Sequence, residues 1–250
     1  GTGTTVDNVA NSGVAAGSLV NSPAWAGAGT FTPGTSTLKM TGSSKNINYT
    51  GDETIGHLHI DAGQTTLNNL SVSDGTDTFT CSSITIDSGT TFTTTSGTTT
   101  LTSTSSNYSL FNAGTFTHNK GKVKVDFETP NYNANSKIEC NTLYDLEIEM
   151  NRTTDSCILE PEGSGTAITF LGDVKVIKGI FNDEINNNTF DIYGQTIIET
   201  NGTFGGSTSW HTGDITHHGL VTINGGTYNR SSAGGTVKMG GIRNIGGTVG

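Results

Sequence analysis

Charge and proline are both scarce in this chain. Only 14% of its 250 residues are charged, and four are prolines. Disordered chains usually combine low hydrophobicity with high net charge and abundant proline, so this composition argues against disorder. The sequence also lacks any apolar run near the roughly 20 residues that a membrane-spanning helix needs. We therefore expect a folded chain that does not insert into a membrane.

Basic residues are few. Twelve Lys and Arg stand against 22 Asp and Glu, which gives a formal net charge of −10. Nucleic acids and anionic lipid surfaces attract basic proteins. The charge balance therefore argues against both as direct partners and predicts a well-solvated acidic exterior.

Cysteine is rare as well. The chain has three cysteines, Cys81, Cys140 and Cys157, and no C-x-x-C pair. Widely spaced cysteines in an odd number indicate neither a zinc centre nor a disulfide framework. At most one pair could bridge, with Cys140 and Cys157 the closest in sequence. The favoured interpretation is that all three are small core residues.

Glycine and threonine are abundant instead, with 35 and 45 residues. Threonine, valine, isoleucine and phenylalanine favour strands, while glycine favours tight corners. No stretch of ten residues keeps apolar residues at the i, i+3, i+4 and i+7 spacing of an amphipathic helix. The composition therefore predicts many short strands joined by turns.

Internal repeats are the strongest feature. A phrase made of Gly-Thr-aromatic, a polar turn and an alternating strand with lysine occurs at 29–42, 114–127 and 226–240. Intervening segments also align: 55–60 with 143–148, 84–92 with 197–204, and 110–116 with 220–228. The aromatics recur at a spacing of about 24 residues, as from Phe92 to Phe116 and from Phe181 to Phe204, which is typical of solenoid turns.

These spacings predict an all-β parallel β-helix, or β-solenoid, of about ten coils with roughly 24 residues each. The step from Phe116 to Tyr228 exceeds the step from Phe31 to Phe116 by about one such unit, so we expect one inserted coil. The expected organisation is a linker or the edge of a preceding segment at 1–28, repeat 1 at 29–113, repeat 2 with the inserted coil at 114–225, and the start of repeat 3 at 226–250.

Alternation indicates which side chains are buried. In 122–127 and 145–150 every second residue is apolar and the others are charged, as in a strand with one face in a core. The aromatic residue of each unit is expected inside. The predicted internal stack consists of Phe31, Phe92, Phe116, Phe181, Phe204 and Tyr228.

The repeated phrase resembles the GTFT-type repeat regions of secreted parallel β-helix surface proteins and adhesins, and of tail or appendage proteins of marine phages. The likeness covers residues 29–250. It implies an extracellular location, on a cell surface or a virion. The family has no shared catalytic motif, so no functional residues carry over.

Two histidine groups could bind a metal. His57 and His59 stand on one face of a strand with Asp61 in line, and a third ligand would have to come from the next coil. The second group is His211, His217 and His218, near Asp214 and Trp210. An exposed polar face and a polar turn are the simpler interpretations.

Acidic residues suggest two further sites. The stripe Asp145, Glu147 and Glu149 offers hard oxygen ligands for Ca²⁺, although the glycine-aspartate nonapeptide of Ca²⁺-binding solenoids is absent. Glycoside hydrolysis needs two carboxylates in a cleft. The residues that could supply them are Glu160, Glu162, Asp173 and Asp183.

Runs of threonine at 93–95, 98–100 and 102–104 could form a flat outward array of the kind that binds ice, but they do not recur at the spacing of the coils.

We assign no catalytic, cofactor-binding or metal-binding residue, and we expect no cofactor. The expected function is that of an extracellular structural or adhesive fibre segment, not an enzyme, that associates with itself or with further repeats. The alternatives are a glycan-binding module of a phage tail fibre or tailspike and a polysaccharide-degrading β-helix enzyme.

Overall fold

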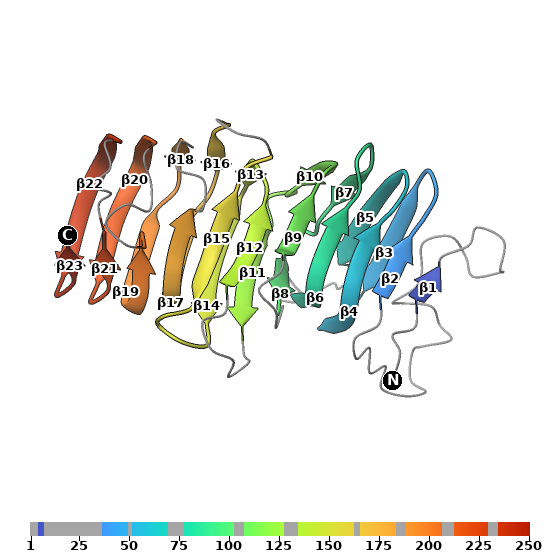
Figure 1. The fold of residues 1–250 in the computed structure, drawn as a ribbon, viewed down its shortest axis with the longest axis horizontal. Coiled ribbons are helices and arrows are strands. Elements are labelled where there is room, and N and C mark those ends of the chain that lie inside the picture. Colours follow the sequence, from blue (N-terminus) through green and yellow to red (C-terminus); the bar gives the residue numbers. More distant parts are fainter. Residues whose placement is uncertain are drawn as a thin grey trace.

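The computed structural model describes residues 5–7, 37–49, 52–69, 78–102, 108–127, 135–162, 166–183, 189–206, 213–229 and 235–250. Every regular element in these ranges is a β-strand, and they contain no helix long and apolar enough to cross a membrane. All strand-to-strand pairings in the ladders are parallel, and the turns stack along one axis (Figure 1). The predicted parallel β-solenoid is confirmed.

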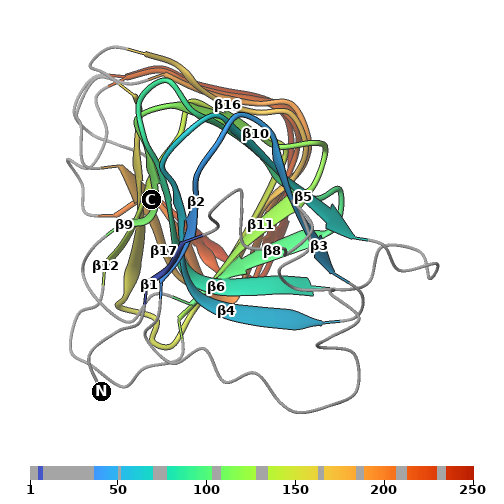
Figure 2. The same ribbon diagram turned by 90° about the vertical axis from the view of Figure 1, so that its right-hand side faces the viewer.

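Each turn has three faces, which Figure 2 shows in a view along the stack. The first face runs through the whole described chain. In order, its strands are β1 (Thr5–Asp7), β2 (Thr37–Met40), the second halves of β4 (Glu53–Ile60) and β6 (Thr78–Ile86), β9 (Tyr108–Asn112), β12 (Asn135–Glu139), β15 (Ser156–Glu160), the second halves of β17 (Val174–Asp183) and β19 (Thr196–Phe204), β21 (Thr227–Tyr228) and β23 (Thr248–Val249).

The second face begins with the first halves of β4 and β6 and is equally continuous. It continues through β8 (Thr98–Leu101), β11 (Lys122–Phe127), β14 (Asp145–Met150), the first halves of β17 and β19, and the second halves of β20 (Ile215–Asn224) and β22 (Val237–Ile245).

The third face is divided into two parts. A separate four-stranded sheet contains β3 (Lys45–Tyr49), β5 (Gln64–Asn69), β7 (Thr91–Thr93) and β10 (Thr115–Thr117). The other part contains β13 (Thr142–Leu143), β16 (Ile168–Phe170), β18 (Phe190–Ile192) and the first halves of β20 and β22.

The predicted alternation places the core inside the coil. In β11 and β14 every second side chain is buried, and Val123, Val125 and Phe127 pair in register with Leu146, Ile148 and Met150. Apolar side chains therefore lie above one another from turn to turn. Every second side chain of each strand points inward, and these side chains stack between turns to fill the interior of the coil.

The number of turns differs slightly from the ten or so that the spacing predicts, because the first face stacks eleven strands between β1 and β23. The spacing of about 24 residues between aromatic residues does correspond to one turn, since Phe92 pairs with Phe116 and Phe204 pairs with Tyr228. Other turns differ in length because the corners differ. The step in register from Thr37 to His57 is shorter than this spacing, and the step from Leu110 to Ile138 is longer.

The predicted single aromatic stack is wrong. Phe181, Phe204 and Tyr228 do stack on the first face, with ring centroids 4.4 Å and 5.1 Å apart. Phe92 and Phe116 instead pair on the third face at 6.1 Å, and Phe116 is only partly buried. Phe31 lies outside the described residues. The Gly-Thr-aromatic phrase therefore marks a strand, but it does not mark one fixed face.

The sequence alignments between repeats also join different faces. His57 to Ile60 belong to the first face, whereas the aligned β14 belongs to the second. The apolar positions match because both segments alternate, not because they occupy equivalent places in the turn.

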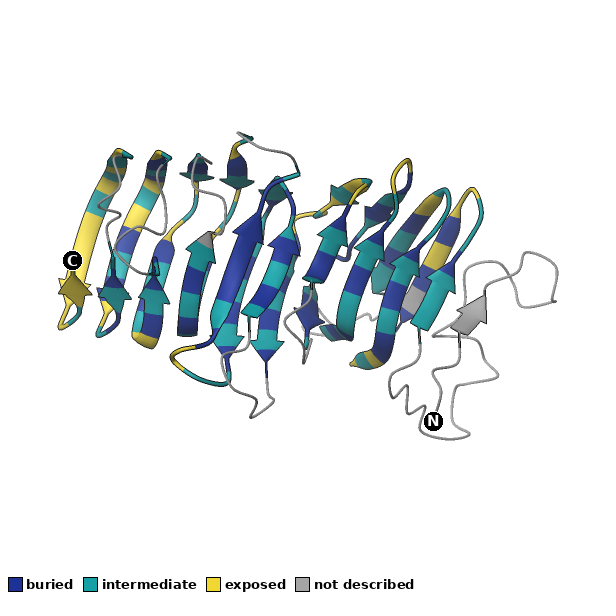
Figure 3. Cartoon of the chain, in the orientation of Figure 1, coloured by how far each residue is buried: buried dark blue, intermediate teal, exposed yellow. Residues whose placement is uncertain are grey.

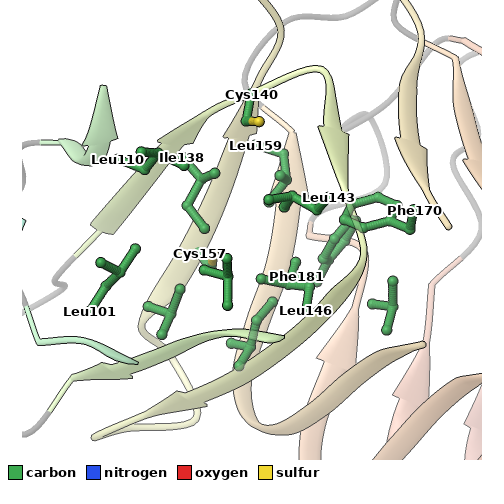
Figure 4. Close-up of a cluster of buried hydrophobic side chains, with 14 of the residues drawn as sticks. Leu101, Leu110, Ile138, Cys140, Leu143, Leu146, Cys157, Leu159, Phe170 and Phe181 are labelled. Atoms are coloured by element: carbon green, nitrogen blue, oxygen red, sulfur yellow. The ribbon is translucent and has the colours of Figure 1, made fainter. Parts of the chain in front are cut away.

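All three cysteines are buried and free, which confirms that they are core residues. Cys140 and Cys157 lie among leucine, isoleucine and phenylalanine side chains (Figure 4). Burial raises the pKa of each of these two thiols to about 12. They are therefore neutral packing residues at neutral pH.

Close contact between turns requires glycine at some corners. Gly63 has a φ of +66°, and a Cβ added there would lie 2.0 Å from the carbonyl oxygen of Gly42 in the preceding turn. Positive φ also occurs at Asn119 and Lys120, in a turn before β11.

Exposure is concentrated at one end of the solenoid (Figure 3). Ile242, Ile245 and Val249 in the strands β22 and β23 are about half exposed, at 50%, 46% and 50%. These strands have a neighbouring turn on one side only, so their outer edge and the adjoining apolar side chains face solvent.

Candidate functional site

The first histidine group forms a cluster whose membership differs from the predicted one. His59 lies on β4, and its Nε2 atom is 2.9 Å from Oδ2 of Asp87, which directly follows β6 in the next turn. Asp61 follows β4, and one of its carboxylate oxygens is 3.1 Å from Nζ of Lys39. One ligand atom from each of His59, Asp61 and Asp87 lies within 4.8 Å of the other two.

His57 does not join this cluster. Its Nδ1 atom is 2.7 Å from Oγ of Ser83, the residue that pairs with it on β6. The side chain that reaches this cluster from the next coil is that of Asp87. The His-x-His spacing correctly indicated the strand that carries the cluster, β4. The partner in the next turn, Asp87, can be identified only from the register between turns.

The second histidine group is divided between the interior and the exterior. His217 is buried, with Nδ1 2.8 Å from Oγ1 of Thr196 and Nε2 3.0 Å from the hydroxyl of Tyr228. Burial lowers its pKa to about 4. His218 points outward, 3.3 Å from Asp191. Adjacent strand residues face opposite ways, so these two cannot share a metal.

His211 and Trp210 lie outside the described residues. Asp214 accepts a hydrogen bond from the backbone N–H of Thr236 at 2.8 Å, so it supports the following turn. Of the described members, His217 and Asp214 therefore support the fold, and His218 lies on the surface.

The acidic stripe on β14 is paired with lysines. Glu147 lies 3.0 Å from Lys122, and Glu149 lies 2.7 Å from Lys124 on the preceding strand. Asp145 accepts a hydrogen bond from the backbone N–H of Asp173 at 2.7 Å. Each carboxylate has a cation or an N–H donor, and among the described residues the three do not bring their oxygens together, so the stripe is a cross-turn ion-pair ladder and a poor Ca²⁺ site.

Two of the four carboxylates considered for glycoside hydrolysis do gather. Glu160 contacts the hydroxyl of Tyr108 and lies 2.8 Å from Lys137, while Glu162 contacts the amide of Asn112. Asp173 lies at a different corner, where it accepts the backbone N–H of Gln195 at 2.7 Å. The side chain of Asp183 is outside the described part.

Glu139 completes this carboxylate cluster and was missed in the sequence. It pairs in register with Glu160, and burial together with the charges of Glu160 and Glu162 raises its pKa. Its Oε2 atom is buried and has no hydrogen-bond partner. The hydrogen bond to Glu160 raises the pKa of Tyr108 to about 12. A spacing of close to one coil between the two glutamates would have been the only signal in the sequence.

The threonine runs do not form one outward array. Thr94, Thr95, Thr99 and Thr100 are buried, and the hydroxyl oxygens of Thr94 and Thr99 are 2.6 Å apart. Outward threonines do recur over two turns of the third face, where β7 and β10 pair. Thr91 pairs there with Thr115, and Thr93 with Thr117.

Comparison with known proteins gives no match to a family model, to a curated protein or to a solved structure. The resemblance to GTFT-type repeat regions therefore stays a prediction, as does every function that it implies.

Proposed function

We propose that the chain is a structural segment of an extracellular fibre or appendage, on a cell surface or a virion, and that it acts without catalysis. The observation that supports this is the continuity of the first-face ladder from β1 to β23. In such an array each turn contacts only its neighbours, and backbone hydrogen bonds run along the axis. The result is a rod whose length grows with the number of turns.

The exterior suits a spacer in water. Lysines and acids of adjacent turns form ion pairs along the second face, as in Lys122–Glu147, Lys124–Glu149 and Lys175–Glu199. Pairs this exposed contribute roughly 0–1 kcal/mol each, so they add solubility more than stability. In the register of β11 with β14, Lys122 lies opposite Asp145 and Lys124 opposite Glu147, while Asp126 lies opposite Glu149.

Association with another copy or with further repeats is part of this proposal. A parallel solenoid grows by adding one more strand to each face, because a strand edge with unpaired N–H and C=O groups is a template for another strand.

Location is tested directly by immunogold electron microscopy with antibodies raised against the 250-residue chain. Intact cells or particles that carry the protein should be labelled on surface fibres or appendages. Labelling only after the cells are opened would contradict an extracellular role.

Glycan binding is the second candidate, and one observation favours it. Tyr144, Leu171, Tyr193 and His218 each directly follow a residue that pairs in register from turn to turn. Tyr193 is 52% exposed and stacked on His218 at 4.3 Å. Exposed aromatic residues with a polar tip are enriched at binding surfaces. Glycan-array binding that Tyr193→Ala removes and Ile245→Ala retains would favour this candidate over a pure spacer.

Catalysis is the candidate that the carboxylate cluster leaves to be tested. Glu160 and Glu162 are both held by neighbouring side chains. Glu139 is the member that could deliver a proton, because its pKa is raised and its Oε2 atom has no hydrogen-bond partner. Incubation with a panel of polysaccharides should release no oligosaccharides. Release by the wild-type chain that is lost in Glu139→Gln would overturn the non-catalytic proposal.

A further inference from the structure

Three side chains of types that commonly bind metals converge at the corner that follows the strands β4 and β6. The structural role proposed above makes no use of them. They are His59, Asp61 and Asp87, called the HDD cluster below. Their ligand atoms lie within 4.8 Å of one another, and within the described ranges no other three His, Cys, Asp or Glu residues converge in this way. The cluster combines an imidazole nitrogen with two carboxylates, so it is more than an accumulation of acids.

The backbone under the HDD cluster is well fixed. Asp61 donates its backbone N–H to the carbonyl of Met40 at 3.0 Å, and Asp87 donates in the same way to Ile60 at 3.0 Å. Asp61 and Asp87 thus occupy equivalent positions in successive turns. Ile60 and Ile86, which immediately precede them, are fully buried. Ligands on such a scaffold need only side-chain rotation to adjust.

The cluster is accessible and carries excess negative charge. The side chains of His59, Asp61 and Asp87 are 28%, 34% and 39% exposed, so an ion can reach them from solvent. With a neutral imidazole the two carboxylates carry two negative charges, and Lys39 at 3.1 Å from Asp61 balances one of them. A divalent cation would balance both and would take the place of the ammonium group.

We propose that the HDD cluster is a divalent transition-metal site that ties two neighbouring turns together, with Zn²⁺ as the ion best suited to it. Zn²⁺ takes imidazole nitrogen and carboxylate oxygen at about 2.0–2.2 Å, which in tetrahedral geometry separates ligand atoms by about 3.3 Å. The present atoms, all within 4.8 Å of one another, need only small rotations to reach this spacing. Water fills the fourth position. Ca²⁺ is excluded as the preferred ion because it requires six to eight oxygen ligands.

Isothermal titration of the full 250-residue chain with ZnCl₂, in metal-free buffer, tests the site. We expect one saturable Zn²⁺ per chain and a rise in melting temperature on binding, because an ion that binds only the folded state stabilises it. His59→Ala should weaken binding about tenfold or more. The matched control is His57→Ala, which removes a histidine on the same face of the same strand that is directed to Ser83. It should bind Zn²⁺ as the wild type does.

The variant Lys39→Met distinguishes a metal site from an ion pair that only stabilises the fold. Removing the competing ammonium should tighten Zn²⁺ binding several-fold. If His59→Ala does not fold, as judged by circular dichroism, Asp87→Asn replaces it, and Co²⁺ absorption reports whether an imidazole-containing site of low coordination number forms in the wild type. Absent saturable binding, equal losses in the two histidine variants, or weaker binding in Lys39→Met would each overturn the proposal.

Discussion

Replacing Phe204 by alanine should be among the most damaging single changes in the core. The ring is fully buried and lies between Phe181, at 4.4 Å and an interplanar angle of 12°, and Tyr228, at 5.1 Å and 4°. Removing a buried phenylalanine costs about 3–5 kcal/mol, and each well-placed aromatic pair adds about 0.5–1.5 kcal/mol to what burial alone provides. We therefore expect a loss near the upper end, about 4–5 kcal/mol.

Urea denaturation followed by circular dichroism measures this loss, and native-state hydrogen exchange shows whether the damage stays near the substituted turn. Phe116→Ala is the control, because Phe116 is only partly buried and its nearest ring, Phe92, is 6.1 Å away and tilted by 46°. It should cost roughly half as much or less. A loss below about 1 kcal/mol for Phe204→Ala, or equal losses for both variants, would refute the two-face description of the aromatic residues.

Three other predictions concern buried groups and corners. Burial lowers the pKa of His217 to about 4, below its ordinary value of 6.5, so the unfolded chain takes up this proton first. Stability should be fully present above pH 6.5 and fall by roughly 3 kcal/mol as the pH drops towards 4. The urea midpoints of the wild type and of His217→Gln, plotted against pH, should diverge between pH 6.5 and pH 4. Parallel curves would contradict the burial of His217. Gly63→Ala should prevent folding or cost several kcal/mol, because its Cβ would meet a carbonyl oxygen at 2.0 Å, whereas Gly89→Ala, with open space and a φ of +77°, should cost only about 1 kcal/mol. Comparing the urea midpoints of the two variants checks this, and equal losses would contradict the close contact between turns. A thiol reagent should leave Cys140 and Cys157 unmodified until urea unfolds the chain, because both are buried and their pKa values are raised to about 12. Rapid labelling of the native protein would show that the interior is open.

The local features of the fold were predictable because they depend on a period of two. The strands at 122–127 and 145–150 bury the side chains that alternation indicates. The spacing from Phe92 to Phe116 is a true step from turn to turn. Both follow from the geometry of one strand or one turn, which a sequence records directly.

The assignment of strands to faces was not predictable in the same way. Phe116 and Tyr228 follow the same Gly-Thr pair, yet one lies on the third face and the other on the first. Corners of different lengths separate the strands, so a spacing in the sequence does not identify a face. Strand preference and turn chemistry are the same on every face, which is why the repeats align across faces.

The candidate sites depend on register and were only partly predictable. The sequence places His59 and Asp61 at the end of one strand, but Asp87 joins them from the next turn. Glu139 meets Glu160 for the same reason, across one turn. Contacts between turns depend on the length of every intervening corner, and a change of one residue there would reverse which side chains face outward.

The fibre proposal is best tested by cryo-electron microscopy of the native particle that carries this chain. We expect a continuous rod of three-faced turns stacked about 4.8 Å apart. A compact domain that encloses a deep groove lined by carboxylates would contradict the proposal, and the protein would then have to be treated as a polysaccharide-processing enzyme.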